Sequence, residues 1–95
     1  MNTPTQTPNH RANAVSVRAI THKVVTCAAI LWNEPRHEVY ARIYARLLYY
    51  YGIDLNAYPR SKGESLLCVA ERIDVIDKVY QLAEAENLYL PLAEN

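Results

Sequence analysis

Apolar side chains recur every three or four positions in the segment after residue 15, which is the spacing of one side of a helix. The stripe consists of Val17, Ile20, Val24, Cys27 and Leu31. Because the segment is also rich in β-branched residues, a strand over residues 15–31 stays an alternative. The sequence WNEPR then breaks the pattern. We expect Asn33 to cap the next helix, with Glu34 and Pro35 in its first turn, where an acid suits the helix dipole and proline loses no hydrogen bond.

The second helix is predicted over residues 34–51. Its apolar side chains fill an arc of about 180°, wider than the stripe of about 100° that one packing contact needs. They are Val39, Tyr40, Ile43, Tyr44, Leu47, Leu48, Tyr50 and Tyr51. This helix is therefore expected to be packed from more than one side. Gly52 is well placed to end it in the left-handed conformation.

A third helix is predicted over residues 62–87, after Ser61, which with Glu64 has the spacing of a capping box. One apolar stripe on it comprises Leu66, Val69, Ile73, Ile76, Tyr80 and Ala83. A second stripe, about 130° away, comprises Cys68, Val75, Val79 and Leu82. We interpret the second stripe as an oligomer interface. In the alternative interpretation the first helix covers one stripe and the second helix covers the other, which gives a monomeric three-helix bundle.

These elements predict an all-α fold, a three-helix unit containing a helical hairpin of residues 34–51 and 62–87. The two wide apolar faces favour assembly into an oligomeric helical bundle. Residues 1–13 contain two prolines and little to bury, so we expect a disordered tail followed by a single domain over residues 14–95.

Composition limits the class of protein. The chain has 95 residues, 51% of them hydrophobic, which suits one small globular core. No apolar run approaches the roughly 20 residues that span a bilayer, and the first residues lack the order of a secretory signal, so a cytoplasmic protein is expected. Cys27 and Cys68 both fall on apolar stripes, and we interpret them as buried thiols rather than a disulfide.

The formal net charge is zero, but the charges are unevenly distributed. Residues 1–46 hold six Lys or Arg against two acids, and residues 47–95 hold four against eight. Such a division can attract a second copy or a charged partner, but it lacks the basic excess of a general nucleic-acid binder.

The sequence carries no catalytic or metal-binding signature. His10, His22 and His37 are not paired at ligand spacing, and no H-E-x-x-H or C-x-x-C stretch occurs. The two glycines, Gly52 and Gly63, form no phosphate-binding loop. We therefore expect no enzyme activity, no metal and no cofactor.

A candidate partner-binding patch lies on the polar side of the second helix. Arg42, Arg46 and Tyr49 lie close together there, and Arg and Tyr are enriched among residues that dominate binding energies. The alternative is a solvated face with an ion pair between Glu38 and Arg42. Direct DNA binding by the arginines of this helix is a further alternative, although the acids near its N-terminus oppose it.

The stretch RHEVYARIYARLLYYYGIDLNAYPRSKGESLLCVAERI, residues 36–73, resembles the helical C-terminal domain of many phage antirepressor proteins. In that domain a helix with spaced tyrosines ends at a glycine, a tyrosine and a Pro-Arg pair follow, and a second amphipathic helix begins. The matching residues are Tyr40, Tyr44, Leu47, Gly52, Tyr58, Pro59 and Arg60. The resemblance covers about 40% of the chain, and we expect no counterpart of the family's usual N-terminal domain within the 35 residues before it. Gly63 also stands where a larger residue is usual.

The resemblance implies a small phage or prophage protein that acts in the bacterial cytoplasm. It would bind a phage repressor and release it from its operator. It also implies that the tyrosine run closes the first helix of the hairpin and that its rings pack across the loop onto the second. An inhibitor of a host defence complex is the alternative within the same class, and direct DNA binding is the alternative outside it.

Overall fold

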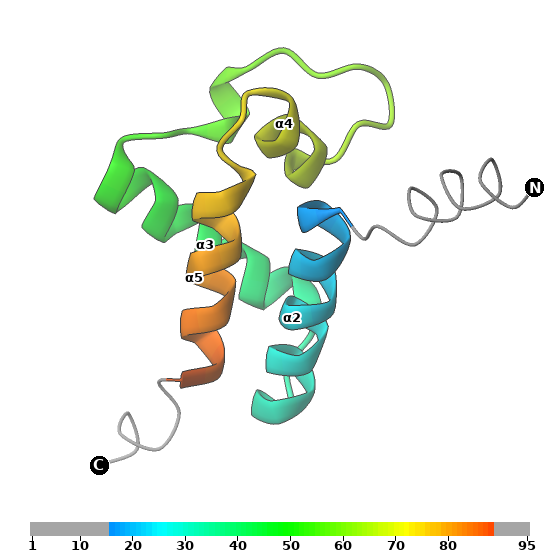
Figure 1. Ribbon diagram of the computed structural model, residues 1–95, viewed down its shortest axis with the longest axis vertical. Helices are drawn as coiled ribbons and strands as arrows, with labels where there is room; N and C mark the ends of the chain where they lie inside the picture. The colour runs from blue at the N-terminus through cyan, green and yellow to red at the C-terminus, as the bar shows by residue number, and fades with distance from the viewer. Residues whose placement is uncertain (1–15, 89–95) are drawn as a thin grey trace, which may run out of the picture.

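The computed structural model describes residues 16–88, which contain helices and no strand (Figure 1). The elements are α2 (Val17–Trp32), α3 (Arg36–Tyr51), the short 3-10 helix η1 (Leu55–Ala57), α4 (Leu66–Arg72) and α5 (Ile76–Leu88). The predicted all-α fold is confirmed, and the strand alternative for the first segment is wrong. The tail predicted over residues 1–13 lies outside the described residues.

Helices α2 and α5 lie side by side, and α3 crosses both of them (Figure 1). The short helix α4 lies at one end of this arrangement, in contact with α2, α5 and η1. The buried side chains of all these elements form one core. They are Val25, Ala28, Ala29, Val39, Ile43, Leu47, Leu55, Leu67, Val69, Ala70, Ile76, Val79 and Ala83.

Helix α2 buries a different side from the one that its sequence pattern predicts. The side chains that it buries are mainly small: Thr21, Val25, Ala28 and Ala29. Small residues allow the backbones of two helices to approach closely, and the buried Thr21 hydroxyl is satisfied by donating to the Val17 carbonyl oxygen at 2.7 Å. The predicted stripe of Val17, Ile20, Val24, Cys27 and Leu31, called the α2 stripe below, therefore faces away from the centre of the core.

The connection between α2 and α3 corrects the predicted role of Asn33. This residue adopts a left-handed conformation, with φ of 56°, and ends α2 instead of starting α3. The next amide, Glu34 N–H, donates to the Ala29 carbonyl oxygen at 2.9 Å. Asparagine tolerates the left-handed region, which is why it serves as a C-terminal cap. Helix α3 begins after Pro35, which provides no side-chain cap.

The helix predicted over residues 62–87 is two helices. Helix α4 begins after Ser65, whose hydroxyl oxygen accepts from Cys68 N–H at 3.1 Å. Ser61 and Glu64 do interact, with Ser61 N–H donating to the Glu64 carboxylate at 3.0 Å, but they lie before the helix. The break occurs at Asp74, whose φ of 63° is incompatible with a continuing right-handed helix. The prediction of one long helix was therefore wrong.

The left-handed Asp74 predicts a specific sensitivity to side-chain shape. Asp74→Val is expected to destabilise the fold by about 1–2 kcal/mol, because a β-branched side chain is strained at positive φ. Asp74→Asn is the matched control and should stay within about 0.5 kcal/mol, since asparagine tolerates this region. Urea unfolding followed by circular dichroism measures both. Equal stability of the two variants would contradict the role given to this break.

Candidate protein-binding surface

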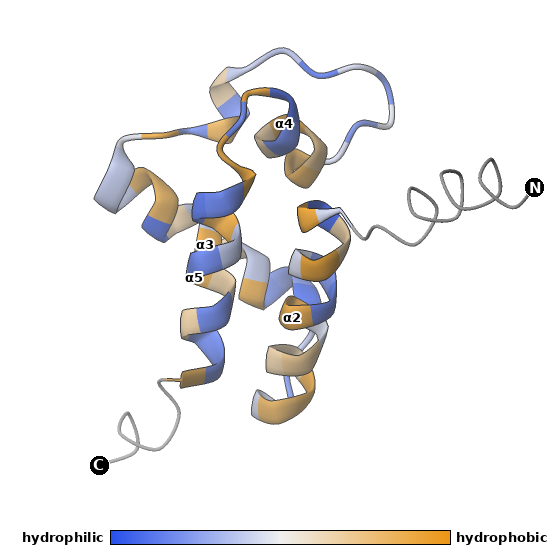
Figure 2. Cartoon of the chain, in the orientation of Figure 1, coloured by the Kyte–Doolittle hydropathy of each residue, from blue (hydrophilic) through white to orange (hydrophobic). Residues whose placement is uncertain are grey.

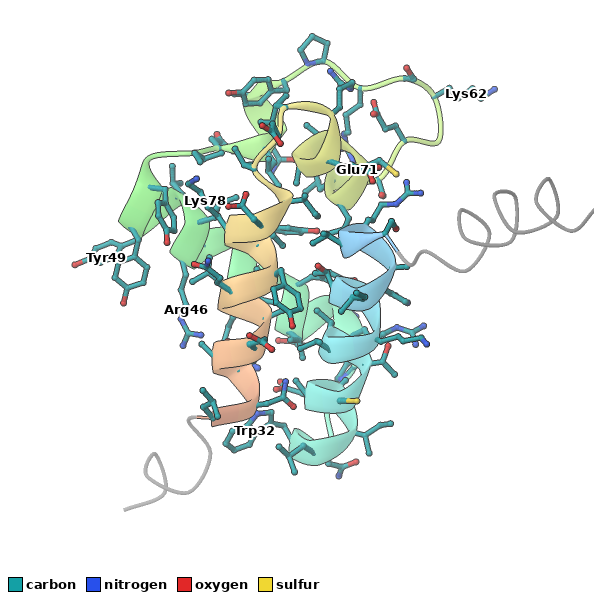
Figure 3. All side chains as sticks on the ribbon, viewed as in Figure 1. Trp32, Arg46, Tyr49, Lys62, Glu71 and Lys78 are labelled. Carbon is teal, nitrogen blue, oxygen red and sulfur yellow. The ribbon has the colours of Figure 1, made fainter. Side chains whose placement is uncertain are left out.

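The last turn of α3 carries four large side chains that are all exposed. Leu48, Tyr49, Tyr50 and Tyr51 are 50%, 81%, 64% and 44% accessible, respectively. Four consecutive helix residues point in four directions, and each of these side chains keeps 44% or more of its surface accessible in the described chain. Figure 1 shows this end of α3 projecting beyond α5, and Figure 3 shows Tyr49 pointing outward from it. We call these four residues the tyrosine patch.

The tyrosine patch is held in a defined arrangement. The rings of Tyr49 and Tyr50 meet edge to face, with 5.0 Å between their centroids. The Lys78 ammonium of α5 lies 5.6 Å from the centroid of the Tyr51 ring. Gly52, with φ of 69°, ends the helix as predicted and turns the chain back toward the buried Leu55. The expectation that the tyrosine rings pack across the loop onto the next helix is wrong for Tyr49 and Tyr50.

The two arginines of the predicted patch are bound by acidic side chains of the same chain. The Arg42 guanidinium donates to Glu86 Oε1 from Nε at 3.0 Å and from Nη2 at 2.8 Å. It also donates to both carboxylate oxygens of Glu34, at 3.1 and 2.5 Å. Arg46 donates from Nη1 to Glu86 Oε2. We call these four residues the Glu86 cluster.

Glu86 is the centre of this cluster and is only 3% exposed. A buried carboxylate needs charged or hydrogen-bonding partners, and two guanidinium groups supply them. The backbone of Glu86 is fixed as well, since its carbonyl oxygen accepts from the Trp32 indole N–H at 2.9 Å. Trp32 lies beside the C-terminal end of α5 in Figure 3. The cluster therefore ties α5 to α3 and to the end of α2.

The predicted contact patch is thus divided by the structure. Tyr49 is the most exposed of its residues, whereas the side chains of Arg42 and Arg46 are 39% and 32% accessible and face Glu86. The alternative pairing of Arg42 with Glu38 is wrong, because Glu38 instead lies 3.6 Å from His37. No sequence pattern indicates Glu86 as the partner of these arginines, because it lies 40 positions or more from both and glutamate is usually a surface residue of a helix. A partner-binding role for Arg42, Arg46 and Tyr49 stays a prediction.

The predicted oligomer stripe of Cys68, Val75, Val79 and Leu82 does not form one surface. Cys68 belongs to α4, Val75 to the connection, and the other two to α5. Val79 is completely buried by its own chain, and Val75 and Leu82 are partly buried against the same core. The Cys68 thiol accepts from Arg18 Nη1 at 2.8 Å. The Ser65 hydroxyl and the Arg18 guanidinium lower the pKa of this thiol.

A second surface feature is a groove of about 610 Å³ between α2, α3 and the start of α4. Its wall is a ladder of rings, in which His22 stacks on Tyr40 and Tyr40 stacks on Tyr44. His22 Nδ1 and the Tyr40 hydroxyl form a hydrogen bond of 2.7 Å. Burial raises the pKa of the Tyr44 hydroxyl. The contacts between His22 and Tyr40 join α2 to α3, whereas the stacking of Tyr40 on Tyr44 lies within α3.

Acid is expected to weaken the Glu86 cluster through Glu34. Hydrogen bonds from Arg42 lower the pKa of the Glu34 carboxyl below its usual value of 4.5. Because the folded-state pKa is the lower one, this group adds stability that is present above the unfolded-state pKa and lost as the pH falls through the folded one. Urea unfolding at decreasing pH should therefore show that the free energy of unfolding falls more steeply for the wild type than for Glu34→Gln. If the free energy of unfolding falls equally in both proteins, Glu34 does not contribute to the acid sensitivity of the fold.

Comparison of the chain with protein-family models, curated proteins and solved structures found no match. Within residues 16–88, His, Cys, Asp and Glu do not gather in groups of three or more that could hold a metal ion. No helix in the same part of the chain is both long and apolar enough to cross a membrane.

Proposed function

We propose that this protein binds another protein through the tyrosine patch and thereby inhibits it. The observation that carries the proposal is the exposure of Leu48 and three successive tyrosines on a helix end that projects from the body. Tyrosine supplies a large contact area with few rotatable bonds and a hydroxyl that can remain hydrogen-bonded, and it is enriched at the centres of protein interfaces.

The charges of α3 favour a protein partner over DNA. A DNA-reading helix needs arginines that reach phosphates or base edges. Arg42 and Arg46 are engaged by Glu86 instead, and reaching DNA would require leaving a buried carboxylate without its cations. Arg18 and Arg72 likewise lie beside Glu71 and Glu64.

The specific form of the proposal is an antirepressor. The stretch that resembles phage antirepressor domains, residues 36–73, includes the whole tyrosine patch together with η1 and α4. In this form the patch binds a phage repressor in the state that cannot hold its operator, so the repressor equilibrium shifts away from DNA. An inhibitor of a host defence complex would use the same surface on a different target.

The test combines capture with an operator-release assay. Tagged wild-type protein is incubated with nuclease-treated lysate of a lysogenic host, and bound proteins are identified by mass spectrometry. A recovered repressor is then titrated on its labelled operator, and wild-type protein should release the DNA. Tyr49→Ser/Tyr50→Ser should lose capture and release at least tenfold, as expected when two central aromatic contacts are removed.

The matched control is Ile30→Ser, which removes an apolar side chain that is 75% exposed on α2. This variant should capture and release like the wild type, because Ile30 lies outside the tyrosine patch. It controls for nonspecific hydrophobic binding. Circular dichroism verifies that all three proteins are folded. Retention of full activity by the double tyrosine variant would contradict the proposed surface. Capture of a defence complex without operator release would contradict the antirepressor form alone.

A further inference from the structure

The α2 stripe is a second apolar surface, of which residues 16–88 leave three of the five side chains exposed. Val17 is 42% exposed, Leu31 is 50% exposed and Cys27 is exposed, whereas Ile20 and Val24 are partly buried. Figure 2 shows that hydrophobic residues make up much of α2. The small residues on its other side already pack against the core. The stripe therefore needs a different contact to be covered.

The spacing of the α2 stripe specifies what kind of helix would cover it. The steps from Val17 to Leu31 are three, four, three and four, which is the alternation of a coiled-coil seam. A three-four seam packs against a helix that carries the same repeat, and a second copy of α2 supplies it. At 1.5 Å per residue the seam is about 21 Å long, so the contact is short and the association should be moderate in strength.

Opposite charges border the two sides of the stripe. Glu84 of α5 lines the same small groove as Val24 and Cys27, so it lies on the side of the stripe next to α5. Lys23 is exposed and lies on the opposite side, about 75° around α2 from the centre of the stripe. A twofold axis parallel to α2 places the Lys23 side of each copy against the Glu84 side of the other. Antiparallel helices would instead place like charges together.

We propose that two copies of this chain associate through their α2 stripes, with the α2 helices parallel about a twofold axis. Lys23 of each copy then faces the acidic border formed by Glu84 of the other. Each dimer carries two tyrosine patches, so a partner with two sites gains affinity from the linkage. This inference goes beyond the proposed function and does not depend on it.

The parallel arrangement makes a covalent prediction. Equivalent seam residues face one another in a parallel pair, so the two Cys27 side chains meet at the axis. Their Cα atoms should lie within the roughly 4.4–6.8 Å that a disulfide requires. Diamide, which accepts the two electrons and two protons released by a pair of thiols, should convert the wild type to a covalent dimer. Non-reducing electrophoresis measures the product.

Cysteine variants identify the bond. Cys27→Ser should yield no covalent dimer, while Cys68→Ser should cross-link like the wild type. Cys68 is a suitable control because it contacts Arg18, which lies about 180° around α2 from Cys27. Cross-linking that requires Cys68, or that fails in the wild type, overturns the parallel arrangement.

Sedimentation velocity tests the association itself, without oxidation. The wild type should form dimers at micromolar concentrations, and Cys27→Glu should weaken the association at least tenfold. Ala19→Glu is the matched control, since this exposed residue of α2 lies about 120° from the centre of the stripe. Its dimers should be as strong as those of the wild type, and circular dichroism verifies that both variants are folded.

A charge exchange tests the orientation. Lys23→Glu and Glu84→Lys should each weaken the dimer several-fold, and the double variant should regain most of the lost affinity. A wild-type protein that stays monomeric at all concentrations overturns the proposal, as does a dimer that Cys27→Glu leaves intact. A double variant weaker than either single variant overturns the parallel pairing of charges.

Discussion

Replacing Val79 with glutamate is expected to abolish cooperative folding at neutral pH. Val79 is completely buried in the core, on the side of α5 that packs inward. An unpaired carboxylate at such a position costs at least about 4 kcal/mol, which approaches the total stability of about 5–10 kcal/mol for a domain of this size. Circular dichroism and urea unfolding measure the loss. Lowering the pH toward 5 should recover part of the structure, because burying the protonated, neutral carboxyl group costs less free energy than burying the carboxylate.

Val75→Glu is the matched control for this substitution. Val75 is only partly buried, in the connection before α5, so the new carboxylate can reach water. We expect a loss of about 1–2 kcal/mol and a protein that still unfolds cooperatively. If Val79→Glu instead stays folded and only changes the mass in solution, Val79 belongs to an oligomer interface and its assignment to the core is wrong.

Removing the Glu86 carboxylate is expected to have the next largest effect. Glu86→Ala leaves Arg42 and Arg46 without their shared acceptor and should destabilise the fold by about 2–4 kcal/mol in urea unfolding. Arg42 keeps Glu34 as a partner, which limits the loss. Glu86→Gln should be intermediate, since the amide retains one acceptor oxygen without the charge.

Glu84→Ala is the matched control on the same helix. Glu84 is exposed and accepts one hydrogen bond, from the Tyr80 hydroxyl at 2.7 Å, so its removal should cost less than about 0.5 kcal/mol. Adding Arg42→Ala to Glu86→Ala should cost less than the sum of the two single changes, because the two residues share one interaction. Equal effects of Glu84→Ala and Glu86→Ala would mean that the Glu86 cluster contributes no more than a surface ion pair.

Local sequence signals predicted much of the helical fold. The apolar repeat of α3 indicates a helix directly, whereas that of α2 indicates a helix with a strand as the alternative. Gly52 ends α3 where a residue without a side chain best adopts positive φ. These features depend on residues close together in the chain, so they can be predicted without knowing the tertiary contacts. Asn33 and Asp74 show the limit of local sequence signals, because both residues adopt left-handed conformations that their residue types permit but do not require.

The tyrosine patch could be identified as a whole only from the tertiary structure. The pattern of α3 places Leu48, Tyr50 and Tyr51 within its apolar arc, yet α3 extends past the core and leaves them exposed. Periodicity shows which residues share a side of a helix, but not how far the neighbouring helices extend along it. The same reason explains why the exposure of Leu48, Tyr50 and Tyr51 could not be predicted, whereas the helical pattern already placed Tyr49 on the polar side.

Helix formation in α3 and its end at Gly52 follow from neighbouring residues alone, since propensity and capping act over one or two turns. The buried side of α3 was already within its predicted apolar arc, but the buried side of α2 depends on packing in the whole fold. Helix α2 offers two apolar sides, and the one with small residues packs on α5, because close approach of the backbones gives more contact than larger side chains on the α2 stripe would. The pairing of Glu86 with Arg42 and Arg46 was decided in the same way, by helices that meet only in the folded chain.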